Sequence, residues 1–327
     1  MSDRPFFSII IPSFKIEPFL EQCLESVLNQ TFTSFECLVL NDDSPGLALE
    51  HWSNGQDPNF AHQFLPSEIA LPDQLEWIFD KVIKNDKRFR LIKKPNEGLA
   101  GTKNRGIDES TGKHLVILDG DDYLKSNYLE VANQAIVNNP NKIIFGTLKT
   151  VRNGQMNSFE SISKFLPKIN KLSTILLFPT WTATPINYFW NLDLIKTRDL
   201  RCVTTGRGED TCFALDSILA YHKEYNTDVE DFVKLDEAVY YYRQFDKQMS
   251  KEKGFELALF QNLANNVTSK LTTLKQISLK HYILGRLFVW RMQLYTFRLK
   301  NDNNYQGKLA GIIAKILSGV ALIVTKV

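Results

Sequence analysis

The sequence has few cysteines, and they form no recognised pattern. Four cysteines occur in 327 residues, and no two of them make a C-x-x-C pair. So few cysteines exclude a disulfide-stabilised scaffold, and the absence of pairs excludes a zinc ribbon or a thioredoxin-type redox site. We therefore expect four buried thiols with no chemical role, at Cys23, Cys37, Cys202 and Cys212.

Long apolar runs are also missing. The first residues, MSDRPFFSIIIPSF, contain no basic segment followed by a long apolar run and no small-residue cleavage site, so they do not resemble an export signal. The apolar run within them is too short to span a bilayer. Together with the cysteine content, these absences predict a cytoplasmic protein.

Charge is nearly balanced over the whole chain but is unevenly distributed. The net charge is +2, and 43% hydrophobic with 23% charged residues excludes a disordered protein. Residues 251–327 carry twelve Lys and Arg against three Asp and Glu, which is +9, so residues 1–250 carry −7. This asymmetry predicts a basic tail that meets something anionic. No helix-turn-helix, zinc or RNP motif accompanies the basic charge, so nucleic acid is not the expected partner.

Apolar runs alternate with helical periodicity through the first 150 residues. This alternation predicts an α/β fold with right-handed crossovers and a mostly parallel sheet that is covered on both faces. A polar insert at about 44–73 is predicted to be a long loop. From residue 254 onward we expect three helices and no strand. The expected strands are 6–11, 35–40, 88–92, 113–118, 141–148 and 236–245, and the expected helices before residue 250 include 20–28, 75–83, 98–110 and 208–221.

Two of the predicted strands end in acids. HLVILDGDDYL places Asp119, Asp121 and Asp122 directly after four apolar residues, and LVLNDD ends in Asp42 and Asp43. In parallel sheets ligands bind beyond the carboxyl ends of the strands. Three crowded carboxylates repel one another and need a cation or strong donors nearby. A divalent cation, Mg²⁺ or Mn²⁺, that carries a diphosphate would satisfy them.

The acid cluster is also compatible with two roles that involve no bound diphosphate. An EF-hand loop is not one of them, because Tyr123 and Leu124 occupy its third-ligand and glycine positions. The acids could be solvated residues that cap a helix beginning near Ser126. A phosphatase of the haloacid dehalogenase kind could also use the Asp119 and Asp121 pair, although that family prefers Thr or Val where this chain has Tyr123 and usually carries the motif on its first strand.

The combination and order of three segments resembles the family-two inverting glycosyltransferases with the GT-A fold, over residues 6 to about 250. The segments are SIIIPSFKIEPFLEQCLESVLNQTF with SFECLVLNDDS, then NEGLAGTKNRGIDESTGKHLVILDGDDYL, then GED. The resemblance implies a GT-A domain at 1–250 and a helical appendage at 251–327. It also implies metal-dependent transfer of a hexosyl or N-acetylhexosaminyl group from a nucleotide-diphosphate donor, usually a UDP-sugar. The acceptor would be a saccharide or a lipid-linked saccharide, as in bacterial surface-polysaccharide assembly.

Carried onto this chain, the resemblance makes Asp121 the direct metal ligand of the D-x-D motif. Asp119 would face the ribose or the water shell of the metal, and Asp122 would support the metal site indirectly. Asp43 matches the acid that accepts from the ring N–H of the base. Pro12 and Ser13 match the turn whose backbone passes the nucleotide.

Two further segments depart from the family pattern. The run TKNRG puts Lys103 where the family has Arg, and a solvated helix lysine is the alternative. The late motif YYYRQF keeps Arg243 as a donor-binding residue, but Phe245 stands at the usual His position, so Arg243 or Lys247 would have to replace that contact. A surface arginine on a packed strand is the alternative.

Glu209 and Asp210 are the candidates for the catalytic base. A hydroxyl that attacks the anomeric carbon must lose its proton, and a carboxylate within hydrogen-bond reach can accept it. The resemblance favours Asp210 as the base, with Glu209 as the alternative. Acids in a first helical turn can also simply complement the helix dipole.

The pattern of apolar residues in 307–327 predicts an amphipathic helix. Leu309, Ile312, Ile316 and Val320 fall on one face with other aliphatic residues, and lysines lie on the opposite side. The lysines make the segment a poor bilayer span, so residues 307–327 are expected either on an anionic membrane surface, at the inner face of the membrane, or against the domain or an oligomer partner.

Two functions other than sugar transfer fit the sequence less well. A sugar-nucleotide pyrophosphorylase expects a glycine-rich loop after the first strand, and IPSFKIEPF has no glycine. A non-catalytic nucleotide-sugar-binding module would lack the acids that this chain retains.

Overall fold

The structure is a computed structural model of the chain. It describes residues 4–46, 73–152, 155–158, 172, 185–204, 207–228, 232–244, 255–301 and 305–326. Most of the predicted insert at 44–73 therefore lies outside the described residues, as do Phe245 and Lys247.

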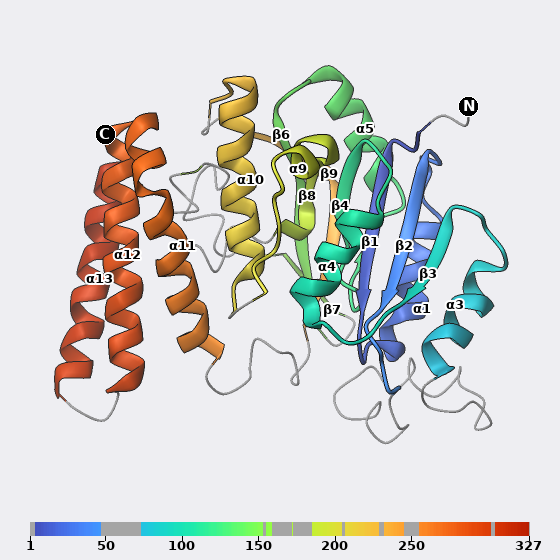
Figure 1. The fold of residues 1–327 in the computed structure, drawn as a ribbon, viewed down its shortest axis with the longest axis horizontal. Coiled ribbons are helices and arrows are strands. Elements are labelled where there is room, and N and C mark those ends of the chain that lie inside the picture. Colours follow the sequence, from blue (N-terminus) through green and yellow to red (C-terminus); the bar gives the residue numbers. More distant parts are fainter. Residues whose placement is uncertain are drawn as a thin grey trace.

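One mixed sheet forms the centre of the molecule, in the order β3-β2-β1-β4-β8-β6-β9-β5, with β7 paired to β6 (Figure 1). The pairs within β3-β2-β1-β4 are parallel, as is β6 with β9, whereas β8, β7 and β5 pair antiparallel. The strands are β1 Phe7–Ser13, β2 Phe35–Asn41, β3 Phe89–Lys93, β4 His114–Ile117, β5 Tyr123–Leu124, β6 Ile143–Arg152, β7 Gln155–Ser158, β8 Tyr188–Asn191 and β9 Phe232–Arg243.

Helices cover the sheet and continue beyond it. Gly106 of α4 lies so close to Ile10 of β1 that an added Cβ would stand 2.9 Å from its side chain. Because side chains alternate along a strand, Ile9 and Ile11 point to the other face of the sheet. The helices are α1 Glu17–Leu28, α3 Gln74–Ile83, α4 Gly98–Glu109, α5 Tyr128–Asn138, α9 Leu192–Thr197, α10 Glu209–Tyr225, α11 Phe255–Ile277, α12 Leu279–Lys300 and α13 Tyr305–Lys326, with a 3-10 turn, η2, at Pro185–Asn187.

The parallel half of the sheet is formed by strands that the sequence predicts as continuous apolar runs. Every residue of β1 is buried, and in β2 only Glu36 is partly exposed. A strand that is buried on both faces has no polar alternation, which is the reason for the continuous apolar pattern. The expected strands and helices before residue 150 are all present, within a few residues of their predicted bounds.

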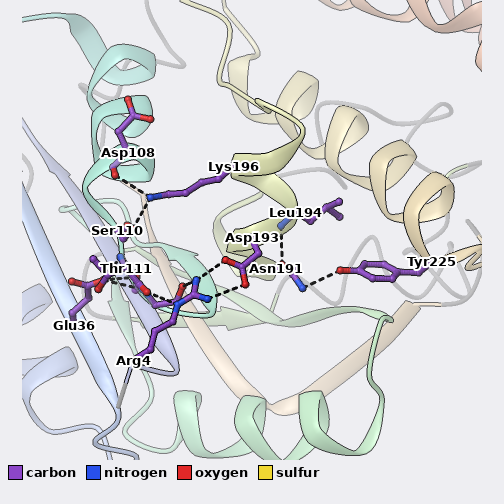
Figure 2. A network of polar contacts seen from close by, with 12 residues as sticks. Arg4, Glu36, Asp108, Ser110, Thr111, Asn191, Asp193, Leu194, Lys196 and Tyr225 are labelled. Carbon is purple, nitrogen blue, oxygen red and sulfur yellow. Dashed lines mark hydrogen bonds and ion pairs between the residues drawn. The ribbon is translucent and has the colours of Figure 1, made fainter. Parts of the chain in front are cut away.

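The amino-terminal edge of the sheet is fixed by a polar network (Figure 2). The Arg4 guanidinium donates to both carboxylate oxygens of Asp193 at 2.9 and 2.7 Å, and to the carbonyl oxygen of Thr111 at 2.6 Å. The Glu36 carboxylate accepts from the hydroxyls of Ser8 at 2.6 Å and Thr111 at 2.8 Å. This network joins four parts of the chain, which are the segment that precedes β1, strand β2, the segment that precedes β4, and helix α9. The carboxyl ends of the strands, where the acids lie, are at the opposite edge.

The described residues from 255 onward form three long helices, as the sequence predicts. Helices α11, α12 and α13 lie side by side beyond α10, with α13 farthest from the β1–β3 end of the sheet (Figure 1). Leu259 and Leu263 of α11 are buried against the rest of the chain. Among the helices of the described residues, none is long and apolar enough to cross a membrane.

Candidate active site

The D-x-D segment forms a tight turn directly after β4. The backbone N–H of Asp122 donates to the carbonyl oxygen of Asp119 at 2.9 Å. Gly120 at the centre of the turn packs against the end of β1, where an added Cβ would stand 3.0 Å from the carbonyl oxygen of Pro12 and 2.9 Å from Ile16. Glycine is needed because no side chain fits between the turn and that strand end. The acids are thereby held at the carboxyl edge of the parallel strands.

Asp122 anchors this turn and is fully buried. Its two carboxylate oxygens accept from the Tyr240 hydroxyl at 2.7 Å and from the backbone N–H of Arg243 at 2.7 Å. The Tyr240 hydroxyl in turn accepts from the backbone N–H of Asp119 at 3.1 Å. Both oxygens of Asp122 are therefore occupied by β9, which suits the indirect role expected for it. The sequence contains no signal for Tyr240, because its partners are more than 100 residues away.

Asp119 and Asp121 lie on the accessible side of the same turn. The Asp119 side chain is 23% exposed, and its buried Oδ1 atom has no hydrogen-bond partner in the part of the chain that the structure describes. Burial, followed by repulsion from Asp119, raises the pKa of Asp121 to about 7. Burial also raises the pKa of Asp119, although the Lys103 charge opposes this. Two carboxylates that are this poorly solvated are stabilised as anions by an added cation.

Carboxylate oxygens are the ligands that Mg²⁺ and Mn²⁺ prefer, so the donor atoms of this turn fit the predicted metal. Within the described ranges, no three side chains among His, Cys, Asp and Glu form a complete metal site. Asp119 and Asp121 supply two carboxylates. A Mg²⁺ ion that binds a phosphorylated ligand usually takes one or two protein carboxylates and completes its coordination with water and phosphate oxygens.

Lys103 connects the D-x-D turn to the second pair of acids. It is fully buried in α4, which rules out a solvated helix lysine. Its amino nitrogen lies 2.6 Å from Oδ1 of Asp210 and 3.6 Å from Oδ1 of Asp119. Burial lowers the pKa of Lys103, but the carboxylates of Asp119, Asp210 and Glu209 outweigh it and raise that pKa well above its usual value. A charged lysine therefore bridges the two acidic groups.

Glu209 and Asp210 form the first turn of α10, as expected. Gly208 precedes them with φ at +84°, and an added Cβ would stand 2.5 Å from Leu259 of α11. Glycine therefore serves both the left-handed backbone and the close contact with α11. Burial, followed by repulsion from Asp210, raises the pKa of Glu209 to about 7. The α11 helix thus helps to fix the position of the candidate base.

The asparagine of TKNRG holds the segment that leads into α10. The Asn104 side-chain amide donates to the carbonyl oxygen of Cys202 at 2.9 Å and accepts from the backbone N–H of Cys202 at 2.8 Å. Asn104 follows Lys103 directly, so α4 contacts both the candidate base Asp210 and the segment before α10. All four cysteines are buried and unpaired, as predicted.

The turns after β1 and β2 are joined to each other. The backbone N–H of Asp42 donates to the carbonyl oxygen of Ser13 at 3.0 Å, and the backbone N–H of Lys15 donates to the Ser44 hydroxyl at 3.0 Å. Asp42 is buried and pairs with Lys94. Asp43 is exposed and has φ at +59°. Of the two adjacent acids, only Asp43 presents an accessible carboxylate.

Arg243 lies beside the D-x-D turn at the end of β9. Its guanidinium donates to the side-chain oxygen of Gln22 at 2.6 Å and stacks over Phe19 at 4.7 Å and Tyr123 at 5.5 Å. It is a partly buried residue with several contacts and not a surface arginine. Nothing in the sequence singles out Gln22, which is a polar residue in the amphipathic pattern of α1.

The family profile described as "Glycosyl transferase family 2" matches residues 8–58 and 71–190, slightly more than half of the chain. The chain belongs to glycosyl transferase family 2. This confirms the family predicted from the sequence, and it favours the glycosyltransferase over the phosphatase.

Curated relatives match over the amino-terminal part. The chain is 32% identical over 122 residues to the uncharacterized glycosyltransferase EpsJ of Bacillus subtilis (strain 168), which covers 37% of this chain and 28% of EpsJ. It is 28% identical over 127 residues to the chondroitin synthase of Pasteurella multocida (strain Pm70), which covers 39% of this chain and 10% of that protein. The matched segment is therefore less than a third of either relative.

Solved structures share the fold over almost the whole chain. Staphylococcus aureus TarS 1–349 in complex with UDP-GlcNAc has a TM-score of 0.64 at 17% identity and covers 94% of this chain and 79% of that one. The mannosyltransferase PcManGT of Pyrobaculum calidifontis, in complex with GDP-Man and Mn²⁺, has a TM-score of 0.54 at 13% identity and covers 98% and 81%. These similarities confirm the predicted α/β, GT-A fold with its helical C-terminal part.

Proposed function

We propose that the chain catalyses metal-dependent, inverting transfer of a sugar from a nucleotide-diphosphate donor to an acceptor hydroxyl. One observation carries the proposal within this family: Lys103 joins the D-x-D turn to the first turn of α10. The carboxylates that we propose to bind the cation and the candidate base are therefore close together, which supports a displacement reaction at this site.

The donor in this proposal is a UDP-sugar, and its diphosphate faces Asp119 and Asp121. The accessible carboxylate of Asp43 would accept a hydrogen bond from the ring N–H of the uracil. The backbone of Pro12 and Ser13 would pass beside the nucleotide. TarS binds UDP-GlcNAc and PcManGT binds GDP-Man with Mn²⁺, which supports a nucleotide sugar as the ligand class. A Mn²⁺ or Mg²⁺ ion held by Asp121, with Asp119 beside it, would neutralise charge on the diphosphate.

The residues of this chain would perform the remaining steps. Asp210 accepts the proton of the acceptor hydroxyl. The hydroxyl oxygen of the acceptor forms a bond to the anomeric carbon, and the bond from that carbon to the diphosphate oxygen breaks. Lys103 holds the Asp210 carboxylate in place at 2.6 Å. Attack opposite to the leaving group inverts the anomeric centre. The acceptor is a saccharide or a lipid-linked saccharide in polysaccharide or glycolipid assembly.

The reaction is tested with a panel of nucleotide sugars, with Mn²⁺, Mg²⁺ or EDTA present. We expect that nucleotide diphosphate is released only when the metal and one particular nucleotide sugar are both present. NMR of the product identifies its anomer and so tests inversion. Asp121→Asn should abolish metal-stimulated turnover, whereas Asp199→Asn, at an exposed carboxylate paired with Arg201, should not. Turnover that is equal in EDTA and in Mn²⁺, or that survives in Asp121→Asn, contradicts the metal role.

A further inference from the structure

We propose that the outer face of α12 and α13 docks in the plane of an anionic lipid bilayer. Two stripes of exposed side chains carry the proposal, and together we call them the outer apolar face: Leu279, Ile283, Trp290 and Phe297 of α12, and Leu309, Ile312, Ile313, Ile316 and Val320 of α13. It lies outside the active site, so the inference does not depend on the identity of the donor.

The packing of α13 is the reverse of that expected for a helix in water. Its aliphatic stripe is between 39% and 60% exposed, whereas its small residues Ala310 and Ala314 are buried. The glycines lie against α12: an added Cβ on Gly311 would stand 2.9 Å from Arg298, and one on Gly307 would stand 2.0 Å from the backbone of Asn301. A surface helix normally buries its large aliphatic residues against the core. Here the large residues face outward, so this face is suited to an apolar environment.

Helix α12 carries a second apolar stripe. Leu279, Ile283, Trp290 and Phe297 recur at helical spacing, and each is at least 36% exposed. Arg286 stacks over the Trp290 ring at 5.4 Å. Tryptophan prefers the membrane–water interface, and an arginine beside it can bury its stem while its charge reaches the headgroups.

The positive charge near the outer apolar face favours binding to an anionic bilayer over binding to a second copy of the chain. Lys308 and Lys315 are exposed, and each precedes a residue of the α13 stripe by one position. Both therefore lie along one flank of the stripe, and not on the opposite side of the helix as expected from the sequence. Residues 251–327 carry +9. Two copies packed through this segment would bring like charges together, whereas an anionic leaflet attracts them. No helix in the described part of the chain can span a bilayer, so the expected arrangement is in-plane.

The test is co-sedimentation of the full chain with vesicles of pure phosphatidylcholine or of equimolar phosphatidylcholine and phosphatidylglycerol. We expect binding to the anionic vesicles that weakens as salt is added. The double variant Ile312→Glu and Ile316→Glu should lower partitioning more than about tenfold. Both positions are more than half exposed, so the fold should persist, and activity on a water-soluble acceptor should be unchanged.

Two further variants separate the contribution of the apolar side chains to vesicle binding from the contribution of charge. Lys308→Gln with Lys315→Gln should weaken binding to anionic vesicles roughly thirtyfold, with no change on phosphatidylcholine. Thr272→Glu with Thr273→Glu, at exposed positions of α11, adds the same two negative charges as the isoleucine variant and should change binding much less. Equal loss in the threonine and isoleucine variants would overturn the proposal, as would equal binding to both vesicle types. The proposal would also be overturned if light scattering showed that the wild type is a dimer that does not bind vesicles, and that the isoleucine variant is a monomer.

Discussion

The amino nitrogen of Lys103 lies 2.6 Å from a carboxylate oxygen of Asp210 and 3.6 Å from one of Asp119, with the lysine side chain fully buried. A buried charge depends on its partners, and removal of one partner leaves the others unpaired. This relationship makes Lys103 the residue through which the D-x-D turn and the candidate base affect each other.

Lys103→Met should therefore destabilise the protein by about 3–5 kcal/mol, because it leaves crowded, partly buried carboxylates without a counter-charge. It should also lower kcat/KM by about a hundredfold or more through misplacement of Asp210. Urea unfolding and steady-state kinetics measure the two effects. The matched control is Lys125→Met, which removes a partly exposed lysine paired with the exposed Glu237 and should leave both quantities near wild type. Unchanged stability in Lys103→Met would contradict the bridging role.

Tyr240→Phe should loosen the D-x-D turn. The change leaves Asp122 with one buried oxygen unpaired and frees the backbone N–H of Asp119, so we expect a loss of about 1–3 kcal/mol and weaker metal-dependent donor binding. Thermal unfolding and donor titration with Mn²⁺ provide the measurements. Tyr188→Phe is the control, because that buried hydroxyl has no hydrogen-bond partner among the described residues. If both variants behave alike, the hydroxyl of Tyr240 does not hold the turn.

The pH dependence of turnover should distinguish Glu209 from Asp210. The pKa of Glu209 is about 7, so its negative charge is lost as pH falls through that value, and kcat/KM should fall with it. Glu209→Gln should remove this inflection and retain turnover, whereas Asp210→Asn should lose turnover at every pH and keep donor affinity. The opposite pattern, with turnover in Asp210→Asn and none in Glu209→Gln, would make Glu209 the base.

Acid should destabilise the fold through His114. Burial lowers its pKa to about 4 from an ordinary value of 6.5, so the unfolded chain takes up a proton that the folded chain refuses. The stability contributed by the neutral ring is complete above pH 6.5 and declines as pH falls toward 4, by about 1.4 kcal/mol per unit and roughly 3 kcal/mol in total. His114→Phe replaces a ring that contacts the rings of Phe6 and Phe7, and this variant should flatten the slope in urea unfolding at several pH values. An unchanged slope in this window would exclude His114 as its origin.

Local pattern was sufficient to predict the parallel half of the sheet. Strands β1, β2 and β4 are buried on both faces and therefore appear as continuous apolar runs, which any single segment reveals. The pairing of β8 between β4 and β6, and of β9 with β5, was not predictable, because it depends on partners far away in the sequence.

The sequence by itself determined the α/β class, the positions of the acids at strand and helix ends, and the family to which the chain belongs. These follow from residue order and local periodicity. Only the tertiary structure decided that Lys103 is buried between Asp119 and Asp210, that Tyr240 holds Asp122, and that α13 turns its large aliphatic residues outward. Each of these depends on contacts between distant segments, and the burial that alters the pKa values of these groups exists only after the chain has folded.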